Sequence, residues 1–170
     1  STDRTLTVQA GVTLRNAQER AADAGFLVPI DFGARNTATI GGIVATNAGG
    51  EEVLRYGMTR ESILGLEVVL PDGTIVLSMN QLIKNNAGYD LKHMFIGSEG
   101  TLGLVTRVVL RLRRKQAGAA TAFVGINHPD QVPALLRHLK ETLGGSLTKF
   151  EIRSEEHTSE LQSRETISYA

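Results

Sequence analysis

Two clusters of glycine limit what this chain can fold into. The first lies in residues 39–50, which read TIGGIVATNAGG, and the second in residues 97–103, which read GSEGTLG. Because glycine has no side chain, its backbone can approach a ligand closely and turn N–H groups toward an anion. Thr39, Thr46 and Asn47 add short polar groups that can bond phosphate or ribose oxygens. Cofactor-binding loops are one interpretation, and tight turns in a β-rich domain are the other.

The spacing of these glycines excludes two common nucleotide-binding motifs. A Rossmann fingerprint is G-x-G-x-x-G opening a helix, whereas the second cluster reads G-x-x-G-x-x-G and precedes a predicted strand. The chain also lacks the P-loop pattern and the G-x-S-x-G motif of a nucleophilic serine. It has no cysteine, which excludes disulfides, a thiol nucleophile and a thiolate metal site.

Charge and hydropathy exclude further classes of protein. The sequence holds 18 basic and 18 acidic residues, which argues against a nucleic-acid-binding protein. No apolar run reaches the roughly 18 residues that a transmembrane helix needs. No two of His93, His128 and His138 have the spacing of metal ligands, so we predict no metal site.

Hydrophobic patterns predict an α+β fold. Strands are predicted over residues 5–10, 63–70, 74–77 and 104–112, and a helix over residues 14–24 with Thr13 as its N-cap. The strand over residues 63–70 is apolar enough to be covered on both faces. In residues 104–112 apolar and polar positions alternate, which predicts that Arg107, Arg111 and Arg113 lie on a solvated face rather than in a ligand site.

A second α+β domain is predicted to begin after a linker near residue 115. Residues 122–126 read as a strand, Asp130 as the cap of a helix that Gly144 ends, and residues 147–152 as another strand. One such β-α-β unit cannot bury both faces of its sheet, so we expect this domain to be truncated. The predicted domains are therefore residues 1–114 and 115–152.

Residues 153–170 have no helix or strand period and are predicted to be disordered. The run RSEEHTSELQS resembles the conceptual translation of a sequencing-library adapter, and a disordered natural tail is the alternative. The tail, which includes His157, is set aside from functional reasoning. It holds two basic and four acidic residues, so residues 1–152 keep 16 basic against 14 acidic ones. That small surplus does not restore a nucleic-acid-binding interpretation.

Several motifs together resemble the FAD-linked oxidase family of the vanillyl-alcohol oxidase/p-cresol methylhydroxylase type. They run in order through residues 6–112, with weaker similarity to Glu151: TIGGIVATNAGG, RYG, LGLEVVLPDG, KNNAGYDL and IGSEGTLG. The branch that the chain resembles includes D-2-hydroxyglutarate, D-lactate and glycolate dehydrogenases.

The resemblance implies a partial FAD-binding domain followed by the start of an α+β cap domain. The pyrophosphate loop of the family would precede Ser1 and its metal and substrate site would follow Ile152, so we expect this fragment alone to retain FAD weakly or not at all and to be inactive. Three segments are expected to contact FAD, residues 31–39, 46–49 and 99–105, and the backbone of two glycines is expected to approach it between the first and the second. The cofactor-binding residues expected from this are Asp31, Ala38, Thr39, Gly41, Gly42, Thr46, Asn47, Ala48, Gly49, Glu99, Gly100, Thr101, Gly103 and Val105.

The resemblance also implies oxidation of a D-2-hydroxy acid by hydride transfer to the flavin, with electrons passing to a quinone, a cytochrome or an electron-transfer flavoprotein. The alternative is a non-catalytic flavin-binding module that acts with a partner protein. No catalytic residue is assigned. The expected location is the cytoplasm, peripheral to a membrane in one alternative, and the mitochondrion in a eukaryote.

A polar group outside the glycine clusters has two interpretations. Lys84, Asn85, Tyr89 and Asp90 suggest either flavin-side or inter-domain contacts or a hydrogen-bonded turn, and the turn is favoured. Arg55 and Tyr56 have two interpretations of equal weight: they approach the ligand cleft, or they have a structural role.

Overall fold

The computed structural model describes residues 4–153 and 167–169 and divides them into two compact units. The first unit comprises the residues up to Gly50 and Tyr56–Lys115, and the second comprises Glu51–Arg55 and the described residues from Gln116 onward. The sequence places a boundary after residue 114. It does not separate Glu51–Arg55 from the first domain, because no change in composition marks that segment.

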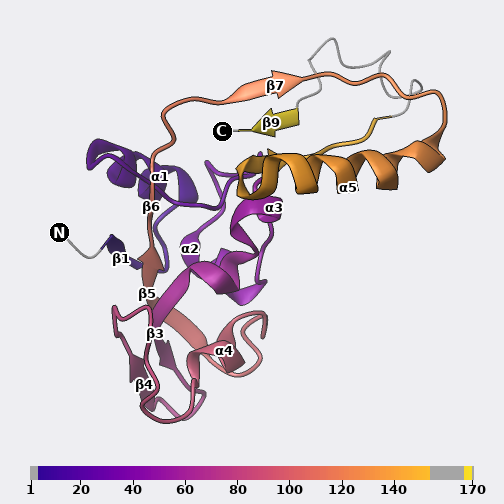
Figure 1. The fold of residues 1–170 in the computed structure, drawn as a ribbon. Helices are drawn as coiled ribbons and strands as arrows, with labels where there is room; N and C mark the ends of the chain where they lie inside the picture. The colour runs from indigo at the N-terminus through magenta and orange to yellow at the C-terminus, as the bar shows by residue number, and fades with distance from the viewer. Residues whose placement is uncertain (1–3, 154–166, 170) are drawn as a thin grey trace. The chain divides into compact units, whose positions relative to one another are not determined.

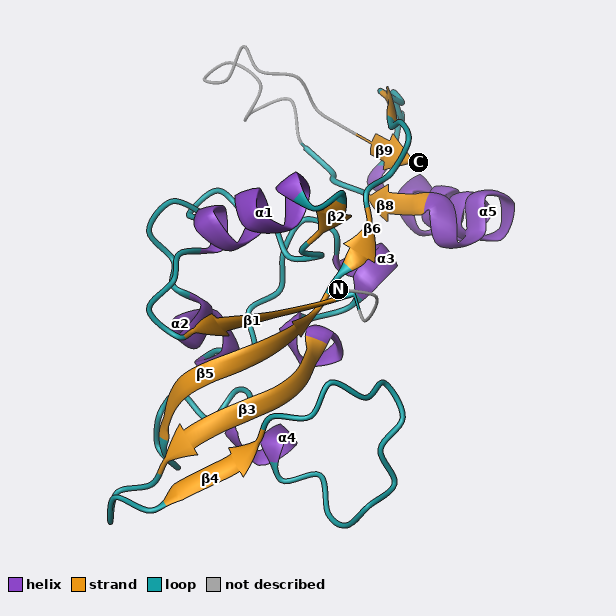
Figure 2. Ribbon diagram, turned by 90° about the vertical axis from the view of Figure 1, so that its left-hand side faces the viewer, coloured by secondary structure: helices purple, strands orange, loops and turns teal. Residues whose placement is uncertain are grey.

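The first unit is built on an antiparallel sheet in the strand order β1-β5-β3-β4 (Figure 2). The strands are β1 (Thr5–Gln9), β3 (Ile63–Val69), β4 (Ile75–Ser78) and β5 (Leu104–Arg111). All four predicted strands are confirmed, with ends that differ by one residue. An antiparallel sheet whose apolar face packs against helices is an α+β architecture, as predicted.

Helix α1 (Leu14–Asp23) forms where local signals predict it. The Thr13 side chain accepts a hydrogen bond of 3.3 Å from the backbone N–H of Asn16, which caps the helix. Leu14, Ala17 and Ala21 are buried on one face. Gly25 follows the helix with φ +78°, a left-handed conformation that glycine adopts without strain.

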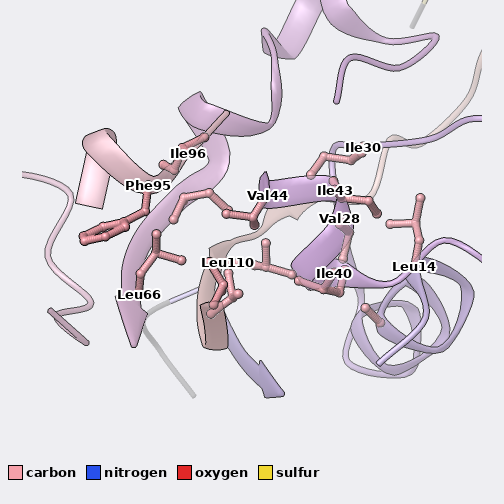
Figure 3. Packing of buried hydrophobic residues seen from close by; sticks show 14 of the residues in the cluster. Leu14, Val28, Ile30, Ile40, Ile43, Val44, Leu66, Phe95, Ile96 and Leu110 are labelled. Carbon is pink, nitrogen blue, oxygen red and sulfur yellow. The ribbon is translucent and has the colours of Figure 1, made fainter. Parts of the chain in front are cut away.

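Helix α2 (Ile40–Ala45) lies inside the first glycine cluster, where the sequence analysis does not predict a helix. Thr39 caps it, since its Oγ1 accepts from the N–H of Gly42 at 3.3 Å. The buried residues Ile40, Ile43 and Val44 have the i, i+3, i+4 spacing of a helical stripe and pack among α1, β3 and β5 in the core (Figure 3). This burial outweighs the low helix propensity of the glycine pair.

The remaining elements of the chain are short. Strand β2 (Phe26–Leu27) pairs with β6 (Arg113–Arg114) (Figure 2). The other helices of these short elements are α3 (Val53–Tyr56) and α4 (Lys92–Phe95) (Figure 1). The 3₁₀ turns are Thr59–Ser62, Pro129–Gln131 and Gly144–Ser146.

The predicted solvated arginine face is correct at Arg107 and wrong at Arg113. Arg107 is exposed and forms an ion pair with Glu67 on the neighbouring strand. The Arg113 guanidinium instead lies over the Tyr56 ring, 5.9 Å from its centroid. Burial, together with the nearby charge of Arg111, lowers the pKa of Arg113. Alternation of side chains identifies a face but does not tell whether other elements cover it.

The second unit contains β7 (Ala120–Ala122), α5 (Val132–Leu143), β8 (Leu147–Lys149) and β9 (Ile167–Tyr169). The helix of the predicted β-α-β unit is confirmed, and its second strand is confirmed over Leu147–Lys149 but does not extend to residue 152. The first strand is shifted, since β7 ends at residue 122 where the sequence places its start. Asp130 does not cap α5: it lies in the preceding 3₁₀ turn, and the helix begins at Val132.

Strand β9 corrects part of the prediction for the tail. It pairs antiparallel with both β7 and β8, so it lies between them. The segment Ile-Ser-Tyr alternates apolar and polar residues, and this pattern suits a strand. The rest of the predicted disordered tail, residues 154–166 and 170, lies outside the described residues.

Candidate functional site

A cavity of about 410 Å³ lies in the first unit where the two glycine clusters meet. Its lining comes from the turn after β1, from α2 and its cap, and from the segment that joins α4 to β5. The lining residues are Ala10, Gly11, Thr39, Gly41, Gly42, Ala45, Phe95, Ser98, Glu99, Gly100, Gly103, Leu104 and Val105.

Two backbone hydrogen bonds hold the two clusters together. The N–H of Gly97 donates to the carbonyl of Val44 at 3.0 Å, and the N–H of Glu99 donates to the carbonyl of Ala45 at 2.8 Å. Val44 and Ala45 are the last residues of α2, whose final carbonyls lack partners within the helix. The second cluster therefore completes the end of α2 and forms one wall of the cavity.

Glycine occupies the positions of this site for two different physical reasons. A Cβ on Gly41 would lie 2.7 Å from the Ala10 Cβ, and one on Gly103 would lie 2.7 Å from Val68 Cγ1. These two positions are glycine because the protein packs closely against them. Gly97 and Gly100 instead have φ of +83° and +79°. The turn interpretation thus accounts for one pair and close packing for the other.

The hydrogen-bond donors of the cavity differ from the sequence expectation. The N–H of Gly41 donates to the Ala10 carbonyl at 2.8 Å, and that of Gly42 to Thr39 Oγ1, so neither is turned toward an anion. Within the described part of the chain, the N–H groups of Gly11 and Gly100 have no hydrogen-bond partner. Both residues line the cavity and lie outside the first cluster.

Seven of the fourteen predicted cofactor-binding residues line this cavity: Thr39, Gly41, Gly42, Glu99, Gly100, Gly103 and Val105. Glu99 is a non-glycine residue with φ +52°, a conformation that costs energy and is often found at functional sites. Phe95, Leu104 and Val105 give part of the lining an apolar character. An apolar lining of this kind suits an aromatic ring.

The other seven predicted residues lie elsewhere: Asp31, Ala38, Thr46, Asn47, Ala48, Gly49 and Thr101. Most have partners within the protein. The Asp31 carboxylate accepts from Arg35 at 2.9 Å and from Gln18 at 3.1 Å. Thr46 Oγ1 donates to the Gly42 carbonyl at 3.0 Å, and Thr101 Oγ1 donates to that of Ser98 at 2.6 Å. Their contacts with the cofactor stay predictions.

The polar candidates outside the glycine clusters also lie away from this cavity. Asn85 Oδ1 accepts from the N–H of Ala87 at 3.1 Å, which is the local bond of a turn. Asp90 accepts from Lys92 Nζ at 2.6 Å, and the residue Tyr89 is 96% exposed. These contacts agree with the favoured turn interpretation. In the second unit, Arg55 donates to Thr148 Oγ1 at 3.5 Å.

A second, polar cavity of about 220 Å³ contains His93 with Arg60 and Asp90. Arg60 Nη1 lies 3.1 Å from His93 Nδ1. Since a guanidinium only donates, Nδ1 accepts, and in the neutral ring the proton is on Nε2, 3.4 Å from Asp90 Oδ2. Burial lowers the pKa of His93, the Asp90 carboxylate opposes this effect, and the cations Lys92 and Arg60 add to it.

Sequence reasoning misses several residues of the site. Ala10, Gly11, Ala45, Phe95, Ser98 and Leu104 line the cavity without belonging to the predicted set. Ser98 stands inside the second cluster and could have been found there. Ala45 likewise stands inside the first cluster, and Leu104 stands between Gly103 and Val105, which belong to the predicted set. Ala10, Gly11 and Phe95 have no such signal in the sequence, and only their distant neighbours bring them to the cavity.

Among residues 4–153 and 167–169, no helix is both long and apolar enough to cross a membrane. In the same residues, no three His, Asp or Glu side chains converge in an arrangement that could hold a metal ion.

Comparisons with known proteins identify the family of this chain. Residues 1–78 match the family described as FAD binding domain. A probable mitochondrial D-2-hydroxyglutarate dehydrogenase of Oryza sativa subsp. indica is 44% identical over 146 residues, which cover 86% of this chain and 26% of that protein. A D-2-hydroxyglutarate dehydrogenase of Xanthomonas citri pv. viticola is 53% identical over 110 residues, which cover 65% of this chain and 23% of the relative.

A solved structure supports the same relationship. An alkyldihydroxyacetonephosphate synthase has a TM-score of 0.61 and 25% identity, and the match covers 71% of this chain and 21% of that one. This chain belongs to the FAD-linked oxidases, as the sequence motifs predict, and its cofactor is FAD. The fold is that of a partial FAD-binding domain. The chain spans about a quarter of the length of the curated relatives it matches.

Proposed function

We propose that this chain is part of an FAD-dependent dehydrogenase that oxidises a D-2-hydroxy acid. The observation that carries the proposal is the cavity formed by both glycine clusters in a chain whose relatives are named D-2-hydroxyglutarate dehydrogenases. Bound FAD supplies the redox chemistry, since it accepts the hydride equivalent that leaves C2 of the substrate while a base takes the hydroxyl proton. Quinone, cytochrome or electron-transfer flavoprotein would then be the electron acceptor.

The residues of this chain would bind and orient the cofactor. The N–H groups of Gly11 and Gly100 would donate to FAD oxygens, while Phe95 and Leu104 would contact an apolar part of it. Glu99 would accept from a hydroxyl group rather than lie beside a phosphate, because two negative charges repel each other. The seven predicted residues outside the cavity would act through the loops that they support.

A pair of matched variants tests the cofactor site. Ala45→Leu places a larger side chain in the cavity, and Ala22→Leu makes the same change at an exposed position of α1. In FAD titrations followed by flavin fluorescence anisotropy, we expect Ala45→Leu to weaken binding at least tenfold, or about 1.4 kcal/mol. Ala22→Leu should bind as the unsubstituted chain does. Equal affinity in all three proteins would refute this site.

The reaction is tested on the protein encoded by the complete open reading frame. Under anaerobic conditions, D-2-hydroxyglutarate, D-lactate or glycolate should bleach the flavin absorbance, while L-2-hydroxyglutarate should not. A stably yellow protein that no 2-hydroxy acid bleaches would favour the alternative, a flavin-binding module that serves a partner. The rice relative is named mitochondrial, so we propose a mitochondrial location in a eukaryotic source and a cytoplasmic one in a bacterium.

A further inference from the structure

We propose that Arg60 is a positioning residue for the FAD cavity. Its side chain and backbone together fix the second glycine cluster (residues 97–103) against the end of α2. Arg60 lies in the 3₁₀ turn Thr59–Ser62, outside both glycine clusters and outside the cavity lining. The proposal rests on the proposed function in one respect only, which is that FAD is the ligand of the cavity.

The Arg60 guanidinium binds the carbonyls that precede the second cluster. Nη1 donates to the His93 carbonyl at 2.7 Å, and Nη2 donates to the carbonyl of Ile96. These carbonyls belong to the last turn of α4 and the residue after it, where a helix leaves acceptors unpaired. A cation near a helix C-terminus is also favoured by the helix dipole. Arg60 thereby anchors the residue directly before Gly97.

The backbone of Arg60 binds the residue that follows α2, on the side of the first glycine cluster. Its N–H donates to Asn47 Oδ1 at 3.0 Å, and Asn47 follows α2 with φ +46°. A Cβ on Gly97 would lie 3.3 Å from the Asn47 Cβ and 3.6 Å from Arg60 Nη2. Arg60, Asn47 and Gly97 are therefore packed together at the point where the two clusters meet.

Arginine suits this position better than lysine. The guanidinium forms contacts with three acceptors, the carbonyls of His93 and Ile96 and the Nδ1 of His93. A planar fork with five donors can satisfy these acceptors at once, while an ammonium group is a single point charge on a flexible stem. Lysine would keep the charge but lose most of this constraint.

Amide hydrogen exchange on the whole chain without added FAD tests the proposal. In Arg60→Ala, the amides of Gly97 and Glu99, which donate to Val44 and Ala45, should exchange at least tenfold faster. The amides of Val108 and Leu110 in β5 should be unchanged. The control is Arg107→Ala, which breaks an ion pair on the sheet and should leave Gly97 and Glu99 protected. Unchanged exchange at both amides in Arg60→Ala would overturn the proposal.

A second variant decides the matter if Arg60→Ala does not fold. Arg60→Lys should speed exchange at Gly97 and Glu99 several-fold while the β5 amides keep their protection, and unchanged rates at the two amides would refute the proposal. In FAD titrations, Arg60→Ala or Arg60→Lys should bind more weakly than Arg107→Ala. If the unsubstituted chain does not bind FAD, as the missing pyrophosphate loop predicts, the exchange data still decide the role of Arg60.

Discussion

The backbone N–H of Glu99 donates a hydrogen bond of 2.8 Å to the carbonyl oxygen of Ala45. This bond joins the second glycine cluster to the last residue of α2, and both residues line the cavity that we propose as the FAD site. The shape of the cavity therefore depends on contacts between segments that are far apart in the sequence.

Close packing at Gly41 predicts that Gly41→Ala destabilises the protein. The new Cβ would stand 2.7 Å from that of Ala10, and overpacking costs about 1–3 kcal/mol. Alanine also gains about 1 kcal/mol of helix propensity, so the net loss should be about 0–2 kcal/mol in urea denaturation. The double variant Ala10→Gly with Gly41→Ala removes the clash and should be more stable than Gly41→Ala alone. The control Gly118→Ala, with open space around it, should be neutral.

Capping threonines can separate stability from cofactor binding. Thr39→Ala and Thr13→Ala each remove a hydroxyl that accepts an N–H at the start of a helix, which should cost about 1 kcal/mol in thermal or urea unfolding. Thr39 lines the cavity and Thr13 does not. Only Thr39→Ala should weaken the binding of FAD in a fluorescence titration. A similar loss of affinity in both variants would show that global stability causes it.

The Glu67–Arg107 ion pair predicts a loss of stability in acid. Hydrogen bonds from Arg107 and then Thr106 lower the pKa of Glu67 to about 2. Glu67 therefore binds a proton more readily in the unfolded state than in the folded state. The stability that the ionised Glu67 contributes is complete above pH 4.5 and disappears as the pH falls toward 2. In unfolding curves measured across that pH range, the free energy of unfolding should decline less steeply for Glu67→Gln than for the unsubstituted chain. Glu19→Gln, which breaks an exposed pair on α1, should keep the slope of the unsubstituted chain.

His93 should be neutral, with its proton on Nε2, near pH 7. Nitrogen NMR of the imidazole rings would detect this tautomer, and a proton on Nδ1 would contradict the Arg60 contact. Because burial lowers its pKa below 6.5, the unfolded state takes up the proton first as the pH falls. Stability should therefore decline below pH 6.5 down to the folded-state pKa. His93→Gln should lack this decline.

Local signals in the sequence predict much of the first unit. Thr13 and Gly25 delimit α1 because a hydroxyl acceptor and a left-handed glycine act on residues close to them. Alternation in residues 104–112 predicts β5 and the buried positions Val108 and Leu110, because successive side chains of a strand point to opposite faces. Sequence motifs also predict the family and its cofactor.

Contacts at long range explain where prediction failed. Helix α2 was missed because Gly41 and Gly42 disfavour a helix, and its stability comes from burial of Ile40, Ile43 and Val44 against other elements. Strand β9 was missed because a three-residue strand depends on its neighbours β7 and β8. The covering of Arg113 by Tyr56 likewise has no local signal.

The sequence by itself determined the strands of the sheet, the capped helix α1, the two glycine clusters and the relationship to FAD-linked oxidases. Only the tertiary structure decided which glycines line the cavity and that two of them, Gly41 and Gly103, also pack against Ala10 and Val68. It also decided that Arg60 joins the two clusters. The physical reason is that a turn or cap is set by neighbouring residues, while a cavity wall is set by hydrogen bonds and packing between distant ones.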